Sequence, residues 1–126
     1  MISITMPNLH VREIKAFVPA KDFELSKQFY KDIGFAMASE GGRIAYFRFE
    51  HASFLLQDFW EETFATNFMM HLLVDDVDAW WHRINASNVV AKYAVKLSVV
   101  ELQPWKMRDF CLKDPSGVLW RIGQNT

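Results

Sequence analysis

Histidines are the first candidates for chemistry in this chain, because an imidazole ring serves both as a metal ligand and as a general acid or base. Four are present, at positions 10, 51, 71 and 82. His71 lies in the apolar run FMMHLLV, where strand alternation places its side chain on the same face as Met69 and Leu73. The other three have no ligand spacing relative to it. We therefore interpret His71 as a hydrogen-bonding residue of a cleft rather than as a metal ligand.

The other reactive residue types also have structural explanations. Asp75, Asp76 and Asp78 resemble a cation-binding loop, but they precede or begin an apolar helix pattern, where acidic side chains cap the helix and interact favourably with its N-terminus. The glutamates at 61 and 62 lie in a connecting segment and are expected on the surface. Cys111 is the single cysteine, and no Ser-His-Asp or Cys-His arrangement accompanies it. We predict no catalytic residue in this set.

Aromatic residues are unusually frequent, since eleven Phe, five Trp and three Tyr make up 15% of the 126 residues. A domain of this size does not easily bury so many rings, so we expect some of them to line a cleft or an interface. Trp80 and Trp81 are exceptions, because their spacing places them on the buried stripe of a helix.

Length, composition and charge exclude several classes of protein. With 126 residues, 51% of them hydrophobic and 23% charged, the chain has the size and composition of one globular domain. The net charge of -1 and the absence of a basic block argue against a nucleic-acid partner. No apolar run reaches the roughly 18 residues of a membrane span, and the first residues lack the pattern of a secretory signal. We expect a cytoplasmic protein without a membrane partner.

The first half of the chain predicts one helix among four strands. Strands are expected at 13–18, 35–39, 43–49 and 52–59. Asp22 is the expected N-cap of the helix, and Gly34 supplies its left-handed end. The apolar positions between these two residues follow the spacing of one buried stripe.

The second half repeats this order. Strands are expected at 68–74, 89–93, 107–112 and 118–122, with a helix after Asp76 and an irregular segment at 94–104. We interpret the chain as a single α+β domain over 1–126, built from two βαβββ modules at about 13–59 and 68–123 with a linker at 60–67. Each half is too small to close its own core, so the two must pack together.

Three segments carry a family resemblance: FVPAKDFELSKQFYKDIGF, HLLVDDVDAWWHRI and LQPWKMRDFCLKDPSGVLWRI, in this order along the chain. Together they resemble the glyoxalase/bleomycin resistance/extradiol dioxygenase superfamily, also known as vicinal oxygen chelate proteins. The passage from Gln103, Pro104 and Trp105 into the DPSG turn is most similar to the bleomycin resistance branch. The resemblance covers about 14–123. It implies eight strands curled around a cleft, in a homodimer whose clefts lie at or near the subunit interface.

The resemblance also implies where catalytic members hold a divalent metal with His and Glu side chains. Those four positions fall here on Lys15, Gln57, Met69 and Arg121, none of which is a histidine or a carboxylate. Two of them are cationic and would repel a divalent ion. We therefore expect no metal and no cofactor at this site. Glyoxalase, fosfomycin-modifying and dioxygenase activities, which depend on that metal, are disfavoured.

The expected cleft instead suits a small-molecule ligand. Flat rings favour stacking on a planar aromatic compound, and Lys15 and Arg121 suit an anionic or carbonyl-rich group. The resemblance places Trp105 along the drug-binding groove, and Trp60 lies in the linker where a partner subunit usually packs. The predicted binding residues are those that strand parity or the resemblance directs inward: Lys15, Phe17, Phe47, Leu55, Gln57, Trp60, Met69, His71, Trp105 and Arg121.

We expect a metal-independent binding protein that sequesters its ligand, as in antibiotic resistance. Drug-binding members of this kind are markedly acidic, whereas this chain is almost neutral. That difference favours a flat neutral or anionic ligand over a basic drug such as bleomycin. One alternative is a metal-dependent lyase or dioxygenase with a displaced ligand set of His71 and Glu50 or Glu101. Another is a structural or regulatory protein whose aromatic surface docks a protein partner.

Overall fold

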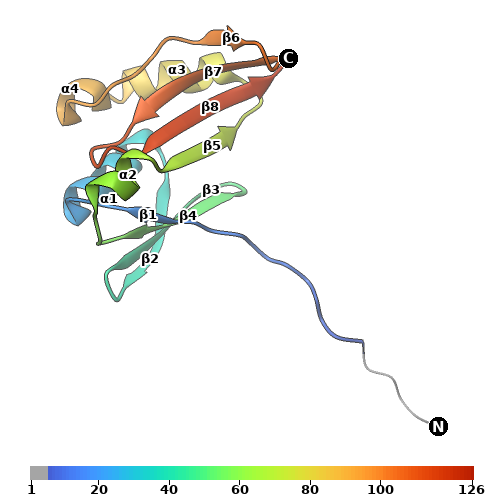
Figure 1. Cartoon of the computed structure of the whole chain (residues 1–126), viewed down its shortest axis with the longest axis vertical. Coiled ribbons are helices and arrows are strands. Elements are labelled where there is room, and N and C mark those ends of the chain that lie inside the picture. Colours follow the sequence, from blue (N-terminus) through green and yellow to red (C-terminus); the bar gives the residue numbers. More distant parts are fainter. Residues whose placement is uncertain (1–5) are drawn as a thin grey trace.

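The computed structural model describes residues 6–126, which form two four-stranded sheets and four helices (Figure 1). The first sheet has the order β1-β4-β3-β2, and the second has the order β5-β8-β7-β6. The pairs β1–β4 and β5–β8 are parallel, and the other strand pairs are antiparallel. Seven of the eight predicted strands are therefore present, and the strands form two separate sheets. Their bounds are β1 Phe17–Pro19, β2 Ala36–Gly41, β3 Ile44–Phe49, β4 Ala52–Gln57, β5 Met69–Leu73, β6 Glu101–Gln103, β7 Met107–Lys113 and β8 Leu119–Asn125.

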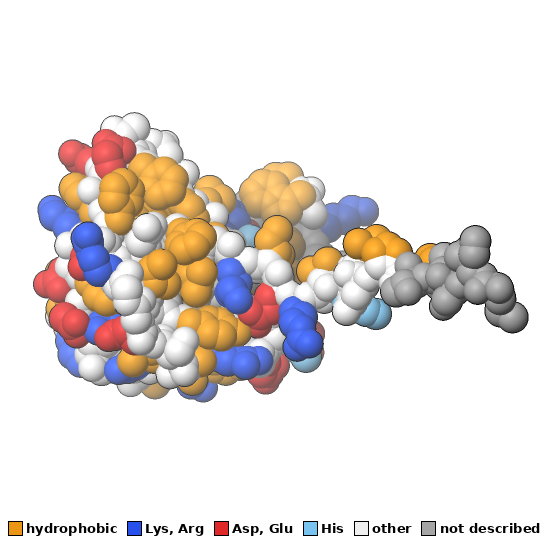
Figure 2. Space-filling model, turned by 90° about the horizontal axis from the view of Figure 1, so that it is seen from below, with side chains coloured by type: hydrophobic (Ala, Val, Ile, Leu, Met, Phe, Trp, Pro, Cys, Tyr) orange, Lys and Arg blue, Asp and Glu red, His pale blue; other side chains and the backbone are white. Residues whose placement is uncertain are grey.

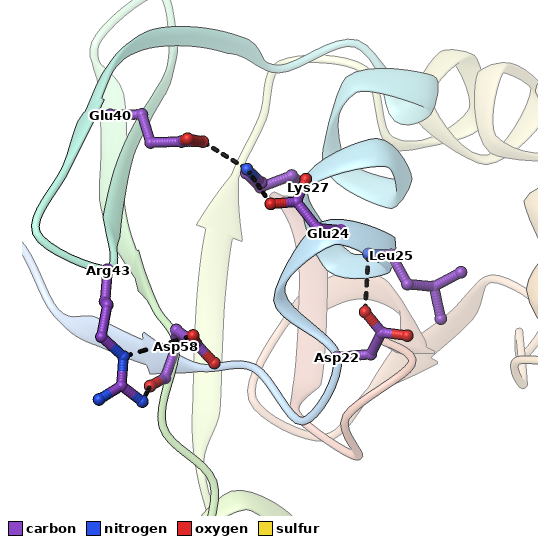
Figure 3. A network of polar contacts seen from close by, with 7 residues as sticks. All are labelled: Asp22, Glu24, Leu25, Lys27, Glu40, Arg43 and Asp58. Carbon is purple, nitrogen blue, oxygen red and sulfur yellow. Dashed lines mark hydrogen bonds and ion pairs between the residues drawn. The ribbon is translucent and has the colours of Figure 1, made fainter.

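Helix α1 (Phe23–Ile33) begins and ends where the sequence predicts. The Leu25 amide donates to the Asp22 carboxylate at 3.1 Å, and Gly34 follows the helix with a φ of 116°. Close contacts join this helix to the first sheet: Figure 3 shows Lys27 between Glu24 and Glu40 of β2. A second pair in the same view, Arg43 and Asp58, links the β2–β3 hairpin to the end of β4.

Helix α3 (Val77–Ala86) confirms the structural interpretation of the acidic cluster and of the paired tryptophans. Asp76 is the N-cap and accepts a hydrogen bond from the Ala79 amide at 3.0 Å. The Trp80 ring packs against Phe49 of the first sheet, with 5.0 Å between centroids. The Trp81 indole nitrogen donates to the Ser98 carbonyl at 2.9 Å.

The strand predicted at 89–93 is wrong, because Val89–Tyr93 forms helix α4. Asn88 adopts a φ of 61° and turns the chain. The helical spacing then buries Val89 and sets the Tyr93 ring edge-on to Phe29 at 5.3 Å, while the Tyr93 hydroxyl donates to Asp32. These tertiary contacts override the strand propensity of the β-branched pair at 89 and 90. The second strand of the module lies instead inside the segment predicted to be irregular, as β6.

The two modules share one core, as their small size requires. The Tyr30 ring of α1 packs against Phe54 of the first sheet and Trp120 of the second, with ring centroids 4.8 Å and 5.7 Å apart. The linker at 60–67 contains a short helix, α2 (Glu62–Thr66), and the Trp60 indole preceding it donates to the Ser116 carbonyl at 2.9 Å. None of the helices within residues 6–126 is long and apolar enough to cross a membrane.

Candidate ligand-binding site

Each sheet has one face in the shared core and one face turned away from it. In β4, Phe54 and Leu56 are buried in the core, so strand alternation directs Leu55 and Gln57 to the other face. In β8, Trp120 and Ile122 are buried, and Arg121 points to the opposite side. We refer to the two outward surfaces as the helix-free faces. They carry Phe17, Leu55 and Gln57 on the first sheet and Met69, His71 and Arg121 on the second.

Phe47 does not belong to this set, contrary to the prediction. It is fully buried, and its ring stacks on Phe54 at 5.5 Å with an interplanar angle of 11°. Because side chains alternate along a strand, an assignment displaced by one residue places a ring on the wrong side of the sheet. Tyr46, the neighbour of Phe47, lies on the helix-free face instead, paired with Leu55.

On the first sheet's helix-free face, Lys15 forms an ion pair. Its ammonium lies 2.7 Å from the Glu13 carboxylate and 4.7 Å from the centre of the Tyr46 ring. The Tyr46 hydroxyl donates to the same carboxylate at 2.7 Å. The hydrogen bond to Glu13 raises the pKa of Lys15. Phe17 is 48% exposed beside this group and offers an open apolar ring.

On the second sheet's helix-free face, Arg121 and Trp105 form a platform. The guanidinium carbon lies 5.5 Å from the centre of the Trp105 ring, which is 57% exposed in the turn between β6 and β7. Arg121 donates to the Asp109 carboxylate at 2.8 Å, and Gln103 donates to the other oxygen at 2.9 Å. The hydrogen bond from Arg121 to Asp109 raises the pKa of Arg121, so the guanidinium remains charged.

His71 lies on the same face and contacts a sulfur atom. Its Nε2 is 3.4 Å from the Met107 Sδ. Met107 belongs to β7 and reaches His71 of β5 across β8, where Gly123 has no side chain to block it: a Cβ on Gly123 would lie 2.5 Å from the same sulfur. His71, predicted to form hydrogen bonds, therefore has a partner in the Met107 thioether, which is a weak acceptor.

Trp60 occupies a different place from the other predicted binding residues. Besides its hydrogen bond to the Ser116 carbonyl, its ring lies 4.6 Å from the Lys21 ammonium. It thus connects the linker to the turns that follow β1 and precede β8. In this chain the ring contributes to the junction between modules.

The residues at the family's metal positions do not fit a divalent cation. Lys15 and Arg121 are paired with carboxylates, and Met69 and Gln57 offer a thioether and an amide. Within residues 6–126, no three His, Cys, Asp or Glu side chains are grouped to hold a metal ion. A metal site of three such side chains that includes His71 and Glu50 or Glu101 is therefore not assembled within those residues.

A cavity of about 550 Å³ lies between the two sheets. Phe35, Phe54 and Trp120 form its aromatic floor, with centroids 5.3 to 5.8 Å apart. Lys15 and His71 are the two predicted binding residues that line it. This cavity could not be predicted from the sequence, because its floor consists of core residues from both modules.

Asp109, Gln103, Glu13 and Tyr46 were also missed as site residues. Strand alternation could have predicted the position of Asp109. Cys111 of β7 pairs with Arg121 of β8, so residues 109 and 111 lie on the same face as Arg121. The other three required knowledge of the β6–β7 and β3–β4 pairings and of the segment that precedes β1.

The chain belongs to the glyoxalase/bleomycin resistance protein/dioxygenase superfamily, whose family profile matches residues 9–122. Among solved structures, a bleomycin-binding protein in complex with bleomycin superposes with a TM-score of 0.79 at 20% identity, covering 92% of this chain and all of that one. TnmS3, an antibiotic-binding protein from Streptomyces sp. CB03234, has a TM-score of 0.73 at 25% identity, covering 97% of this chain and all of that one.

An enzyme shares the fold as well. A lactoylglutathione lyase from Agrobacterium tumefaciens superposes with a TM-score of 0.65 at 18% identity, with 94% of this chain and 95% of that one covered. A search of curated proteins found no match. Fold similarity therefore accompanies both binding proteins and an enzyme, and the side chains of the site must decide between the two classes.

Proposed function

We propose that this protein binds a planar aromatic small molecule on its helix-free faces, without a metal, and acts by sequestering that compound, as in antibiotic resistance. The observation that carries the proposal is the half-exposed Trp105 ring, which lies over the Arg121 guanidinium that the buried Asp109 holds in place. An open ring above a positioned guanidinium is a stacking surface prepared before the ligand arrives, which reduces the entropy lost on binding. The antibiotic-binding relatives support a role of the same kind.

We further propose that two copies complete each cleft. Phe17 lies on the first sheet and Trp105 beside the second, and both rings are about half exposed, so each has an open side that a second copy would cover. Figure 2 shows hydrophobic side chains exposed between charges of both signs, and the segment before β1 extending from the body. Leu9, Val11 and Ile14 in that segment are largely exposed. A second copy would cover such apolar surface.

Calorimetric titration with a panel of planar aromatic compounds, bleomycin included, tests the binding function. Trp105→Ala should weaken binding at least about tenfold, on the order of 1.4 kcal/mol, because it removes the stacking surface. Phe64→Ala is the matched control, since Phe64 is a similarly exposed ring on α2. Chelator-treated protein should bind equally well. Binding that resists Trp105→Ala would move the site to the cavity between the sheets, and turnover that needs added metal would favour the lyase or dioxygenase alternative.

Light scattering tests the pairing of copies. We expect a particle of twice the 14.8 kDa chain mass. Phe17→Asp should yield monomers, because a charge on the helix-free face opposes burial there. Phe64→Asp, on a helix outside that face, should leave the dimer intact. A monomeric wild-type protein that still binds ligand would contradict the proposed pairing while leaving the binding function in place.

A further inference from the structure

We propose that Asp109 determines ligand specificity at the Trp105 platform, so that this site selects an uncharged planar aromatic carbonyl compound over the matching carboxylate. The inference rests on the proposed binding function and narrows the expected ligand, which carries an anionic or carbonyl-rich group, to a neutral carbonyl compound.

The Asp109 carboxylate is held in one position by its partners. Asp109 is 1% exposed, and both of its carboxylate oxygens are engaged: Oδ1 accepts from Gln103 at 2.9 Å, and Oδ2 accepts from Arg121 at 2.8 Å. A buried carboxylate with two charge-assisted or amide partners has a fixed position. It holds the Arg121 guanidinium beneath the Trp105 ring, so the platform is formed before any ligand binds.

The charges of the two ionised groups at the platform cancel. Arg121 and Asp109 form an ion pair, so the platform has no net charge. An incoming carboxylate would lose its hydration and would lie near the Asp109 carboxylate. Its attraction to Arg121 would be weak, because Asp109 already compensates that positive charge. On the first sheet, the pairing of Lys15 with Glu13 removes the other predicted free cation in the same way.

Arg121 keeps hydrogen-bond donors that Asp109 does not engage. A guanidinium has five N–H groups, and the hydrogen bond to Asp109 comes from one nitrogen, Nη1. The side chain of Arg121 is 26% exposed, so it can donate to an oxygen at the edge of a ring stacked on Trp105. A carbonyl oxygen costs much less to dehydrate than a carboxylate and accepts the same hydrogen bond. The platform therefore recognises a neutral carbonyl group beside a flat ring.

The test compares two probes of the same shape, 2-naphthamide and 2-naphthoate, by calorimetry or by the shift of the Trp105 indole N–H signal. Wild-type protein should prefer the amide at least fivefold. Asp109→Asn keeps the size of the side chain but leaves the platform with one positive charge, so the preference should shift toward naphthoate by about tenfold. Arg121→Gln leaves the carboxylate unpaired and should shift the preference further toward the amide, which provides a second readout if Asp109→Asn folds poorly.

The ratio of the two affinities separates specificity from structural support. If Asp109 only held the platform together, both variants would weaken both probes in parallel and leave the ratio unchanged, which would overturn the inference. Equal binding of the two probes to wild-type protein would overturn it as well, while leaving the proposed binding function intact. Failure of every aromatic compound to bind wild-type protein would instead remove the proposed function, and the inference with it.

Discussion

Tyr30 of the first module and Asp114 of the second form a buried hydrogen bond at the centre of the shared core. The Tyr30 hydroxyl donates to the Asp114 carboxylate at 2.5 Å and accepts from the Trp120 indole at 2.8 Å. Asp114 also accepts from the amides of Ser116 and Val118, each at 2.9 Å, which closes the turn before β8. The contact thus connects the helix of one module to the final hairpin of the other, and it determines how β8 and Arg121 are positioned.

Replacing Tyr30 by Phe should destabilise the fold by about 1–3 kcal/mol, because the buried Trp120 N–H and one Asp114 oxygen lose their partner. Urea denaturation measures the change. Tyr93→Phe is a suitable control, since its hydroxyl also donates to a carboxylate but lies in a more exposed place, and it should cost less than about 1 kcal/mol. Equal stability losses for the two variants would show that the buried Tyr30 hydroxyl contributes no more to stability than the more exposed Tyr93 hydroxyl.

Asp114→Asn should change how stability depends on pH. Burial raises the pKa of the Asp114 carboxyl from 3.8 to about 6, although Tyr30 and the amides of Ser116 and Val118 donate to it. The folded state therefore binds this proton more tightly than the unfolded state, and the contribution of Asp114 to stability decreases as the pH rises from about 4 to about 6. The cost of ionising the buried carboxyl is fully present above that range and amounts to about 3 kcal/mol.

An amide cannot ionise, so Asp114→Asn lacks this cost. The difference in free energy of unfolding, variant minus wild type, should therefore increase by up to about 3 kcal/mol as the pH rises from 4 to 7. The carboxamide introduced by this substitution would still offer an oxygen to the Ser116 and Val118 amides. Chemical denaturation at several pH values gives the difference directly. A difference that stays constant across this range would show that the Asp114 carboxyl does not titrate between these pH values.

Gly123→Ala should disturb the contact between Met107 and His71. The added methyl group would lie 2.5 Å from the Met107 Sδ and 3.3 Å from the Asp109 Cβ. We expect a loss of about 1–3 kcal/mol from overpacking. Met107→Ala opens the space again, so the two substitutions together should cost less than the sum of their separate effects. A double-mutant cycle measures this coupling, and additive effects would contradict the packing seen across β8.

Asp76→Ala should cost about 1 kcal/mol, because the Ala79 amide at the first turn of α3 loses its acceptor. The adjacent Asp75→Ala is a matched control: it removes the same charge beside the same helix but not the cap. Thermal or urea denaturation of both variants separates capping from the general interaction of acidic residues with the helix N-terminus. Equal losses would assign the effect to charge alone.

Local chemistry in the sequence alone determined both ends of α1, the start of α3 and the repeat. Asp22, Gly34 and Asp76 act through their own side chain or backbone on residues one to four positions away, so their roles can be predicted without knowing the fold. The three family segments likewise predicted the fold class and the superfamily. Strand alternation placed Leu55, Gln57, His71 and Arg121 on the faces where the structure shows them.

Contacts between distant residues decided the rest. Val89–Tyr93 became a helix because it packs against α1, and Phe47 entered the core because the β3–β4 register directs it there. The charge of the site depended on tertiary structure most of all. Lys15 and Arg121 are cations in the sequence, but Glu13 and the buried Asp109 compensate them, and twelve positions separate Arg121 from Asp109 along the chain. Composition counts charges, whereas only the fold determines which of them lie close enough to cancel.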